Sequence, residues 1–113
     1  METTAERSRK AAHNQALMRE VNERIEQLAE DAAHPEFLCE CANQECTQTI
    51  ELSIAEYEAI RSSPERFPVK PGHDYPEFER VVDKNERFAV VEKFGEAARV
   101  VRKLDPRSRE QTF

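Results

Sequence analysis

Residues 37–46 have the sequence Phe-Leu-Cys-Glu-Cys-Ala-Asn-Gln-Glu-Cys, which places Cys39, Cys41 and Cys46 within eight positions. The next histidine along the chain is His73, in a Pro-Gly-His turn, and the intervening residues leave room for a strand and a helix. Zinc takes four tetrahedral sulfur or nitrogen ligands, and three cysteines with one histidine are a standard structural set. We therefore expect structural Zn2+ at a zinc-knuckle-like Cys3His site formed by Cys39, Cys41, Cys46 and His73.

A second histidine competes for the fourth ligand position. His34 precedes Cys39 by only five residues. It stands directly before Pro35, and the residue before a proline is pushed out of helical geometry, so His34 is more simply explained as the end of a helix. The Pro-Gly-His turn is rigid, and its glycine permits the positive φ that a tight ligand turn often needs. His73 is therefore the preferred ligand.

The cysteines allow three other interpretations. They can be small buried apolar residues, or a redox pair in which Cys39 or Cys41 joins Cys46. The redox pair requires a lowered thiol pKa, whereas Glu40 and Glu45 beside the thiols are expected to raise it. The ligand types also resemble those of CDGSH-type proteins, which hold a two-iron cluster. Those proteins have Cys-x-Cys followed by Cys-Asp-Gly-x-His, a spacing that this chain lacks.

The chain has 113 residues and is long enough for one domain. The stretch 35–95 is a small core, which supplies few kcal/mol of net stability, so a structural metal has a physical purpose there. We find no nucleophile-and-base set among the serines, lysines and acids, and three thiolates leave a zinc ion weakly Lewis acidic. The protein is therefore predicted not to be an enzyme.

The net charge of -6 is unevenly distributed, with 13 acids and 7 bases in residues 35–95. An acidic surface repels phosphate backbones, so nucleic acid is a disfavoured partner. The C-terminal bases suit an acidic partner or a solvated tail: Arg99, Arg102, Lys103, Arg107 and Arg109. We expect no signal peptide and no contact with a membrane, since no apolar run is long enough, and a cytoplasmic location follows.

Residues 4–31 contain neither glycine nor proline and predict one long amphipathic helix. Its apolar or small residues recur at helical spacing, with Asn14 in the same phase and Leu17 widening the stripe: Ala11, Met18, Val21, Ile25, Leu28 and Ala32. We expect this stripe to be buried, either on the core or on a second copy of the helix.

The remainder predicts a small antiparallel sheet with a short helix. Strands are expected at 49–52, at 67–70 on a sheet edge, and as a hairpin at 78–83 and 87–94. Ser53 and Glu56 form a capping box for a helix to about residue 61, while 96–104 suits either a helix or a strand. The class is therefore α+β, with a helical arm at 1–34, a zinc-stabilised domain at 35–104 and a disordered tail at 105–113.

Four blocks of the sequence occur together: FLCECAN-x2-C at 37–46, IELS-x2-EYEAIR at 50–61, RF-x-V-x-PGH at 66–73 and VVEK at 90–93. In combination they resemble a group of small uncharacterised actinobacterial-type proteins, over residues 16–107. The resemblance implies a bacterial, cytosolic origin and a shared fold, and it supports pairing His73 with the cysteines. It implies no activity.

These observations favour a non-enzymatic zinc-binding module that serves protein interaction or regulation. Its partner would be another protein or a second copy, bound through the N-terminal helix. Two alternatives remain open. One is a thiol-based redox sensor that releases zinc on oxidation, and the other is a transcription-associated protein that binds nucleic acid through the basic tail and the helix residues Arg7, Arg9 and Lys10.

Overall fold

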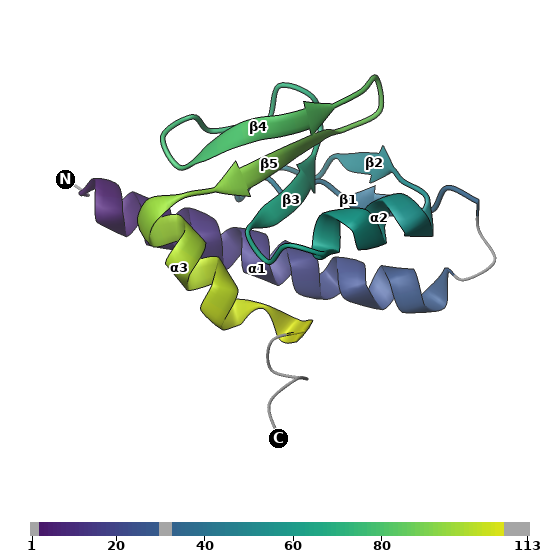
Figure 1. The fold of residues 1–113 in the computed structure, drawn as a ribbon, viewed down its shortest axis with the longest axis horizontal. Helices are drawn as coiled ribbons and strands as arrows, with labels where there is room; N and C mark the ends of the chain where they lie inside the picture. Colours follow the sequence, from purple (N-terminus) through teal and green to yellow (C-terminus); the bar gives the residue numbers. More distant parts are fainter. Residues whose placement is uncertain (1–2, 30–32, 108–113) are drawn as a thin grey trace.

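The computed structural model describes residues 3–29 and 33–107, which form a mixed α+β fold (Figure 1). In chain order the elements are α1 (Thr4–Leu28), β1 (Glu36–Leu38), β2 (Thr49–Glu51), α2 (Ile54–Arg61), β3 (Arg66–Val69), β4 (Glu79–Lys84), β5 (Ala89–Lys93) and α3 (Gly95–Leu104). β1 pairs with β2, and a second sheet has the order β3-β5-β4, with every pair antiparallel. The predicted α+β class is confirmed. None of the described helices has the length and apolar character needed to cross a membrane.

α1 begins at a capped end and lies along the core. The Thr3 hydroxyl accepts a hydrogen bond from the N–H of Glu6 at 3.1 Å, which satisfies a donor that a helix start leaves unpaired. The helix ends at Leu28, and residues 30 and 31 of the expected span lie outside the described residues. Figure 1 shows α1 running beneath both sheets, with α3 against its N-terminal half. The segment expected as an arm is thus packed against the rest of the chain.

The expected buried face of α1 is right only in part: Ala11 is buried, and Met18 and Ile25 are half-buried. Leu17, Val21 and Leu28 are exposed by 56%, 43% and 77%. The buried face is rotated around the helix from the expected stripe and consists of small and polar residues: Ser8, Ala11, Ala12, Gln15, Ala16, Arg19 and Asn22. Polar side chains can be buried when their hydrogen bonds are satisfied, and the partners of these residues lie in distant parts of the chain.

α2 and the β1–β2 pair enclose one apolar cluster. The predicted capping box is confirmed: the Ser53 hydroxyl accepts from the N–H of Glu56 at 3.1 Å, and the Glu56 carboxylate accepts from the N–H of Ser53 at 2.8 Å. Tyr57 and Ile60 are buried. Tyr57 stacks on Phe37 of β1 with 4.5 Å between ring centroids, so the helix is fixed against the strand that leads into the cysteines.

β5 is the central strand of the larger sheet and is covered on both faces. Val90 belongs to the apolar cluster beside α2, whereas Val91 belongs to the cluster that includes residues of α1 and α3. The predicted hairpin of β4 and β5 is present, with an irregularity between Val81 and Asp83. β3 lies at the edge of the sheet, as its proline at position 68 predicts, because proline has no N–H for a strand ladder.

The chain remains packed beyond the last helix. Residues 95–104 form a helix rather than a strand, with Ala97, Ala98 and Val101 buried. Asp105 is only 4% exposed, and its carboxylate lies 2.6 Å from the Arg61 guanidinium. Residues 105–107 therefore do not belong to a disordered tail, and residues 108–113 of that expected tail lie outside the described residues.

The C-terminal bases were expected to suit an acidic partner. Most of them instead form ion pairs with acidic residues of this chain. The pairs are Arg99 with Glu96, Arg102 with Glu65, and Arg107 with Glu23, Glu26 and Glu58. Each pair reduces the positive charge that a nucleic acid or an acidic protein would meet. Arg109 lies outside the described residues.

Two leucine-to-alanine substitutions test the assignment of the buried faces. Leu52 is fully buried and Leu28 is 77% exposed. We expect Leu52→Ala to lower the free energy of unfolding by about 2–5 kcal/mol, because it leaves a cavity in the core. Leu28→Ala should change it by less than about 0.5 kcal/mol. Urea unfolding of both variants measures the difference, and equal losses would contradict the assigned faces.

Candidate metal centre

Cys39, Cys41, Cys46 and His73 lie together, as the sequence predicts. The three sulfur atoms and one imidazole nitrogen all lie within 4.8 Å of one another. His73 Nδ1 is 3.6 Å from Cys39 Sγ and 3.7 Å from Cys46 Sγ. Cys39 and Cys41 are buried, and the other two residues are half-buried. The four side chains can therefore hold one metal ion at the edge of the core.

The cysteine loop, residues 39–46, begins where the chain passes from one sheet to the other. The N–H of Cys39 donates to the carbonyl of Gln48 at 3.0 Å, continuing the β1–β2 pair, but the N–H of Glu40 donates to the carbonyl of Pro68 in β3 at 2.9 Å. Alternate side chains of an extended chain point to opposite sides. Here Cys39 and Cys41 face His73, while Glu40 faces α1.

A tight turn brings the third cysteine back to the first two. The side-chain oxygen of Asn43 accepts from the N–H of Glu45 at 2.9 Å, and its carbonyl accepts from the N–H of Cys46 at 3.1 Å. Asparagine is common in such turns because its side chain can replace a backbone acceptor. The loop is therefore shaped by its own hydrogen bonds before any metal is considered.

The second turn supplies the histidine. The N–H of His73 donates to the carbonyl of Lys70 at 3.0 Å, and Gly72 has a φ of +88°, the positive value anticipated for this glycine. The N–H of Lys70 donates to Cys39 Sγ at 3.1 Å. A backbone donor directed at sulfur stabilises its anionic form, which is the form that binds metal.

The competing histidine does not join the cluster. His34 is exposed and is not among the residues whose ligand atoms converge. It does not form the expected end of the helix either, because α1 ends at Leu28. His73 is thus the histidine that the fold brings to the cysteines.

The thiols have unequal proton affinities. The hydrogen bond from Cys39 lowers the pKa of Cys41 to about 5, and bonds with His73 and the backbone of Asn43 act in the same direction. The same thiol contact, together with burial, raises the pKa of Cys39 above its usual value. The expectation that neighbouring acids raise the thiol pKa is therefore wrong for Cys41, whose pKa is lowered chiefly by the hydrogen bond from Cys39.

The polar face of α1 holds the chain that enters the cysteine loop. Three carboxamide side chains bond to its peptide groups: Asn22 to the N–H and carbonyl of Leu38 at 2.8 and 2.9 Å, Gln15 to the carbonyl of Glu40 at 3.0 Å, and Asn14 to the carbonyl of Cys41 at 3.2 Å. Buried peptide groups without partners are costly. These three side chains therefore replace bonds that a continuous strand would have made.

A buried ion pair lies on the same side of the loop. Arg19 Nε is 3.7 Å from Glu40 Oε1, and both side chains are almost fully buried. Burial raises the pKa of Glu40 to about 7, against the opposing effect of the Arg19 charge. Arg19 also donates to the carbonyls of Pro64 and Arg66, and its guanidinium lies 3.7 Å from the centre of the Phe67 ring. One arginine thus joins α1, β3 and the loop.

The sequence predicts the cluster of candidate ligands but not these supporting residues. It places Asn14 in an apolar stripe and gives no role to Gln15, Arg19 or Asn22. A signal is present, since these three recur at helical spacing on the same face as small alanines that allow close packing. The sequence of the helix does not indicate which peptide groups these three side chains bond to.

Comparison with protein-family models, curated proteins and solved structures gives no match for this chain. A likeness of fold would leave function open in any case, because one fold can host many activities. The chemistry of the four converging ligands is therefore the basis for assigning a role.

Replacing Arg19 by methionine tests its place in the structure. Arg19→Met leaves Glu40 buried without its cation and two carbonyls without donors, so we expect a loss of about 3–5 kcal/mol in the free energy of unfolding. The matched control is Arg80→Met, because Arg80 is exposed and has one surface ion pair, with Glu92. The control should lose less than about 1 kcal/mol. Urea unfolding distinguishes them, and equal losses would contradict this role for Arg19.

Proposed function

We propose that this protein is a non-enzymatic zinc-binding interaction module, in which Cys39, Cys41, Cys46 and His73 hold one structural Zn2+. A tetrahedral zinc ion with sulfur at about 2.3 Å and imidazole nitrogen at about 2.0 Å separates these two ligand atoms by about 3.5 Å. The distances of 3.6 and 3.7 Å from His73 Nδ1 to two of the sulfurs support this geometry. They are the observation that carries the proposal.

The ligand arrangement also supports a single ion with a structural role. A two-iron cluster places its ligands on two separate metal atoms, whereas here all four ligand atoms converge within 4.8 Å. Four protein ligands complete a tetrahedron and leave no position for the water that a catalytic zinc ion requires. The proposal therefore favours zinc over an iron–sulfur cluster, and stabilisation over catalysis.

The interaction role rests on the surface that this arrangement leaves available. α1 uses its polar face to hold the cysteine loop, and its other face presents exposed leucine and valine side chains. Large apolar side chains grouped on a surface are typical of protein-binding sites. A reducing compartment such as the cytoplasm suits the proposal, because free thiols persist there and can bind metal.

Elemental analysis of three proteins tests the zinc proposal. Wild type should contain one zinc ion per chain. His73→Ala should lose most of it, because a ligand is removed, and its melting temperature should fall. His34→Ala should keep a full complement, because His34 is exposed and outside the cluster. Full zinc content in both variants, or no metal in wild type, would reject the ligand set.

A redox sensor is a second candidate, favoured by the lowered pKa of Cys41 and the partial exposure of Cys46. Peroxide would oxidise two thiolates to a disulfide and be reduced to water, and the zinc ion would leave with its ligands lost. If the metal is structural, we expect zinc to be retained and all three thiols to titrate as reduced after mild peroxide treatment. Stoichiometric zinc release with loss of two thiols, reversed by a reductant, would instead establish the sensor.

A further inference from the structure

The exposed face of α1 carries a row of residues at coiled-coil spacing, which we call the seam. Six residues spaced alternately four and three apart lie along it: Lys10, Asn14, Leu17, Val21, Arg24 and Leu28. Leu17, Val21 and Leu28 are the large apolar members, and all three are exposed. Alternating spacings of three and four residues are those of a helix that packs along its length against a second helix.

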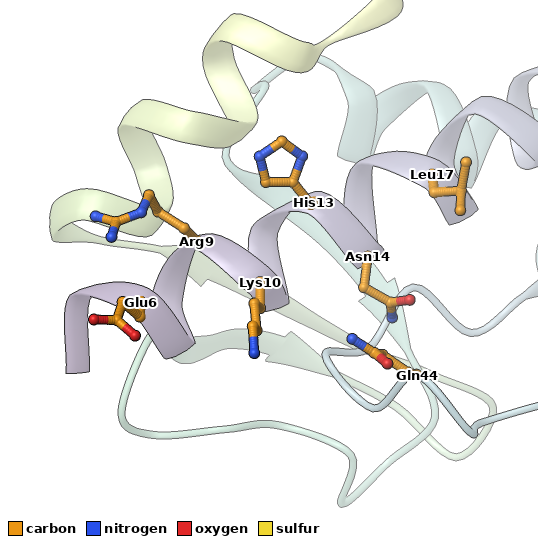
Figure 2. A pocket seen from close by; sticks show the side chains of 7 residues that line it. All are labelled: Glu6, Arg9, Lys10, His13, Asn14, Leu17 and Gln44. Atoms are coloured by element: carbon orange, nitrogen blue, oxygen red, sulfur yellow. The ribbon is translucent and has the colours of Figure 1, made fainter. Parts of the chain in front are cut away.

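A groove of about 720 Å3 lies over the N-terminal half of this seam. Its walls are six residues of α1 and one of the cysteine loop: Glu6, Arg9, Lys10, His13, Asn14, Leu17 and Gln44. Figure 2 shows Arg9 and His13 on one side of α1, and Lys10 and Asn14 on the other, with Gln44 beside Asn14. The groove and the projecting Val21 and Leu28 thus occupy opposite halves of one helix face.

The charges along one edge of the seam alternate in sign. In chain order this edge carries Glu6, Arg9, Glu20 and Arg24, and His13 lies between the two halves. A second copy of the helix packed parallel and in register would place Arg24 against Arg24 and Lys10 against Lys10, with like charges opposed. An antiparallel copy reverses the order, so that each acid meets a base. Charge therefore favours the antiparallel orientation.

We propose that α1 pairs antiparallel with α1 of a second copy of this chain, about a two-fold axis between residues 15 and 16. Leu17 of one copy then packs beside Asn14 and Leu17 of the other, and Val21 packs on the aliphatic stem of Lys10. This pairing specifies the partner in the proposed function and rests on it for the interaction role.

The same register matches the charges at the edge. Glu20 of the second copy lies between Arg9 and His13. Arg24 of the second copy lies beside Glu6 and opposite Arg7, whose charge is balanced by Glu77 of its own chain. Because of the two-fold symmetry, each of these contacts occurs twice in the interface. Opposite charges at the edge of a helix pair select the partner and its orientation. The proposed interface therefore has apolar contacts along the seam and ion pairs between opposite charges along its edge.

The pairing also fills the groove and sets the strength of the dimer. Leu17, Val21 and Arg24 of the second copy enter it, against a wall that includes Gln44. Residues 6–24 span only about 27 Å at 1.5 Å per residue, which places the interface at the small end of specific protein contacts. The dimer should accordingly dissociate at concentrations on the order of 1–100 μM.

Sedimentation velocity of the zinc-loaded chain, from micromolar to near-millimolar concentration, tests the pairing. Wild type should pass from monomer to dimer, and Leu17→Lys combined with Val21→Lys should remain monomeric, because the new charges face each other and Lys10. Val82→Lys is the matched control, because Val82 is similarly exposed but lies on β4, and it should dimerise as wild type does. A wild type that stays monomeric, or a double variant that still dimerises, would overturn the proposal.

Charge reversal on separate chains tests the orientation. Arg9→Glu and Glu20→Arg should each weaken self-association about tenfold, because each variant opposes like charges in its own dimer. An equal mixture of the two variants should associate as wild type does, since every edge contact between them joins an acid to a base. A mixture that associates no better than either variant alone would rule out the antiparallel register.

Zinc content is measured on every sample, so that the two proposals can fail separately. A wild type that retains zinc but stays monomeric refutes the pairing alone. A wild type that dimerises without zinc refutes the proposed zinc centre alone.

Discussion

The position of the cysteine loop depends on hydrogen bonds between the polar face of α1 and the chain that crosses from one sheet to the other. At residues 38–41 the backbone leaves β1 and has no continuous strand beside it, so its peptide groups need other partners. Gln15 and Asn22 supply them, and Arg19 balances the buried charge of Glu40. If these side chains turned away, the peptide groups of residues 38–41 would stay buried without partners, at a cost of about 1–3 kcal/mol for each. The polar face therefore selects one arrangement of the helix, as well as stabilising it.

The cysteines lie on the opposite side of the same chain, where the physical problem is electrostatic. Three sulfurs within 4.8 Å cannot all be ionised without a cation, because like charges at this separation repel strongly. The raised pKa of Cys39 and the lowered pKa of Cys41 express this competition for protons. A divalent metal ion bound here would remove the conflict by replacing the protons, and would tie the cysteine loop to the turn that carries His73. The loop would then be held from both sides, by α1 through the backbone and by the metal through the side chains.

The features predictable from the sequence are those with local causes. The capping box of Ser53, the positive φ of Gly72 and the edge position of β3 each depend on residue types within a few positions. The convergence of the four candidate ligands was predictable because three cysteines crowded among polar residues are typical of a metal site and untypical of a core. The position of the buried face of α1 was not predictable. Gln15 and Asn22 are buried because they bond to carbonyls of residues 38–41, and the sequence of the helix does not indicate those distant partners. Similarly, the alternation along β5 does not reveal that both Val90 and Val91 are covered, because the two covering clusters come from separate parts of the chain.

One residue connects the buried and exposed faces of α1. Asn14 bonds to the carbonyl of Cys41 and also lines the groove on the exposed face, where Gln44 of the cysteine loop forms part of the same wall. One wall of that groove therefore depends on the conformation of the loop. A loop held by metal presents one fixed wall, whereas a loop without it loses the constraint on Gln44 and on the peptide group that Asn14 binds. The surface that α1 offers to a partner is consequently not independent of the cysteines, although no cysteine lines it.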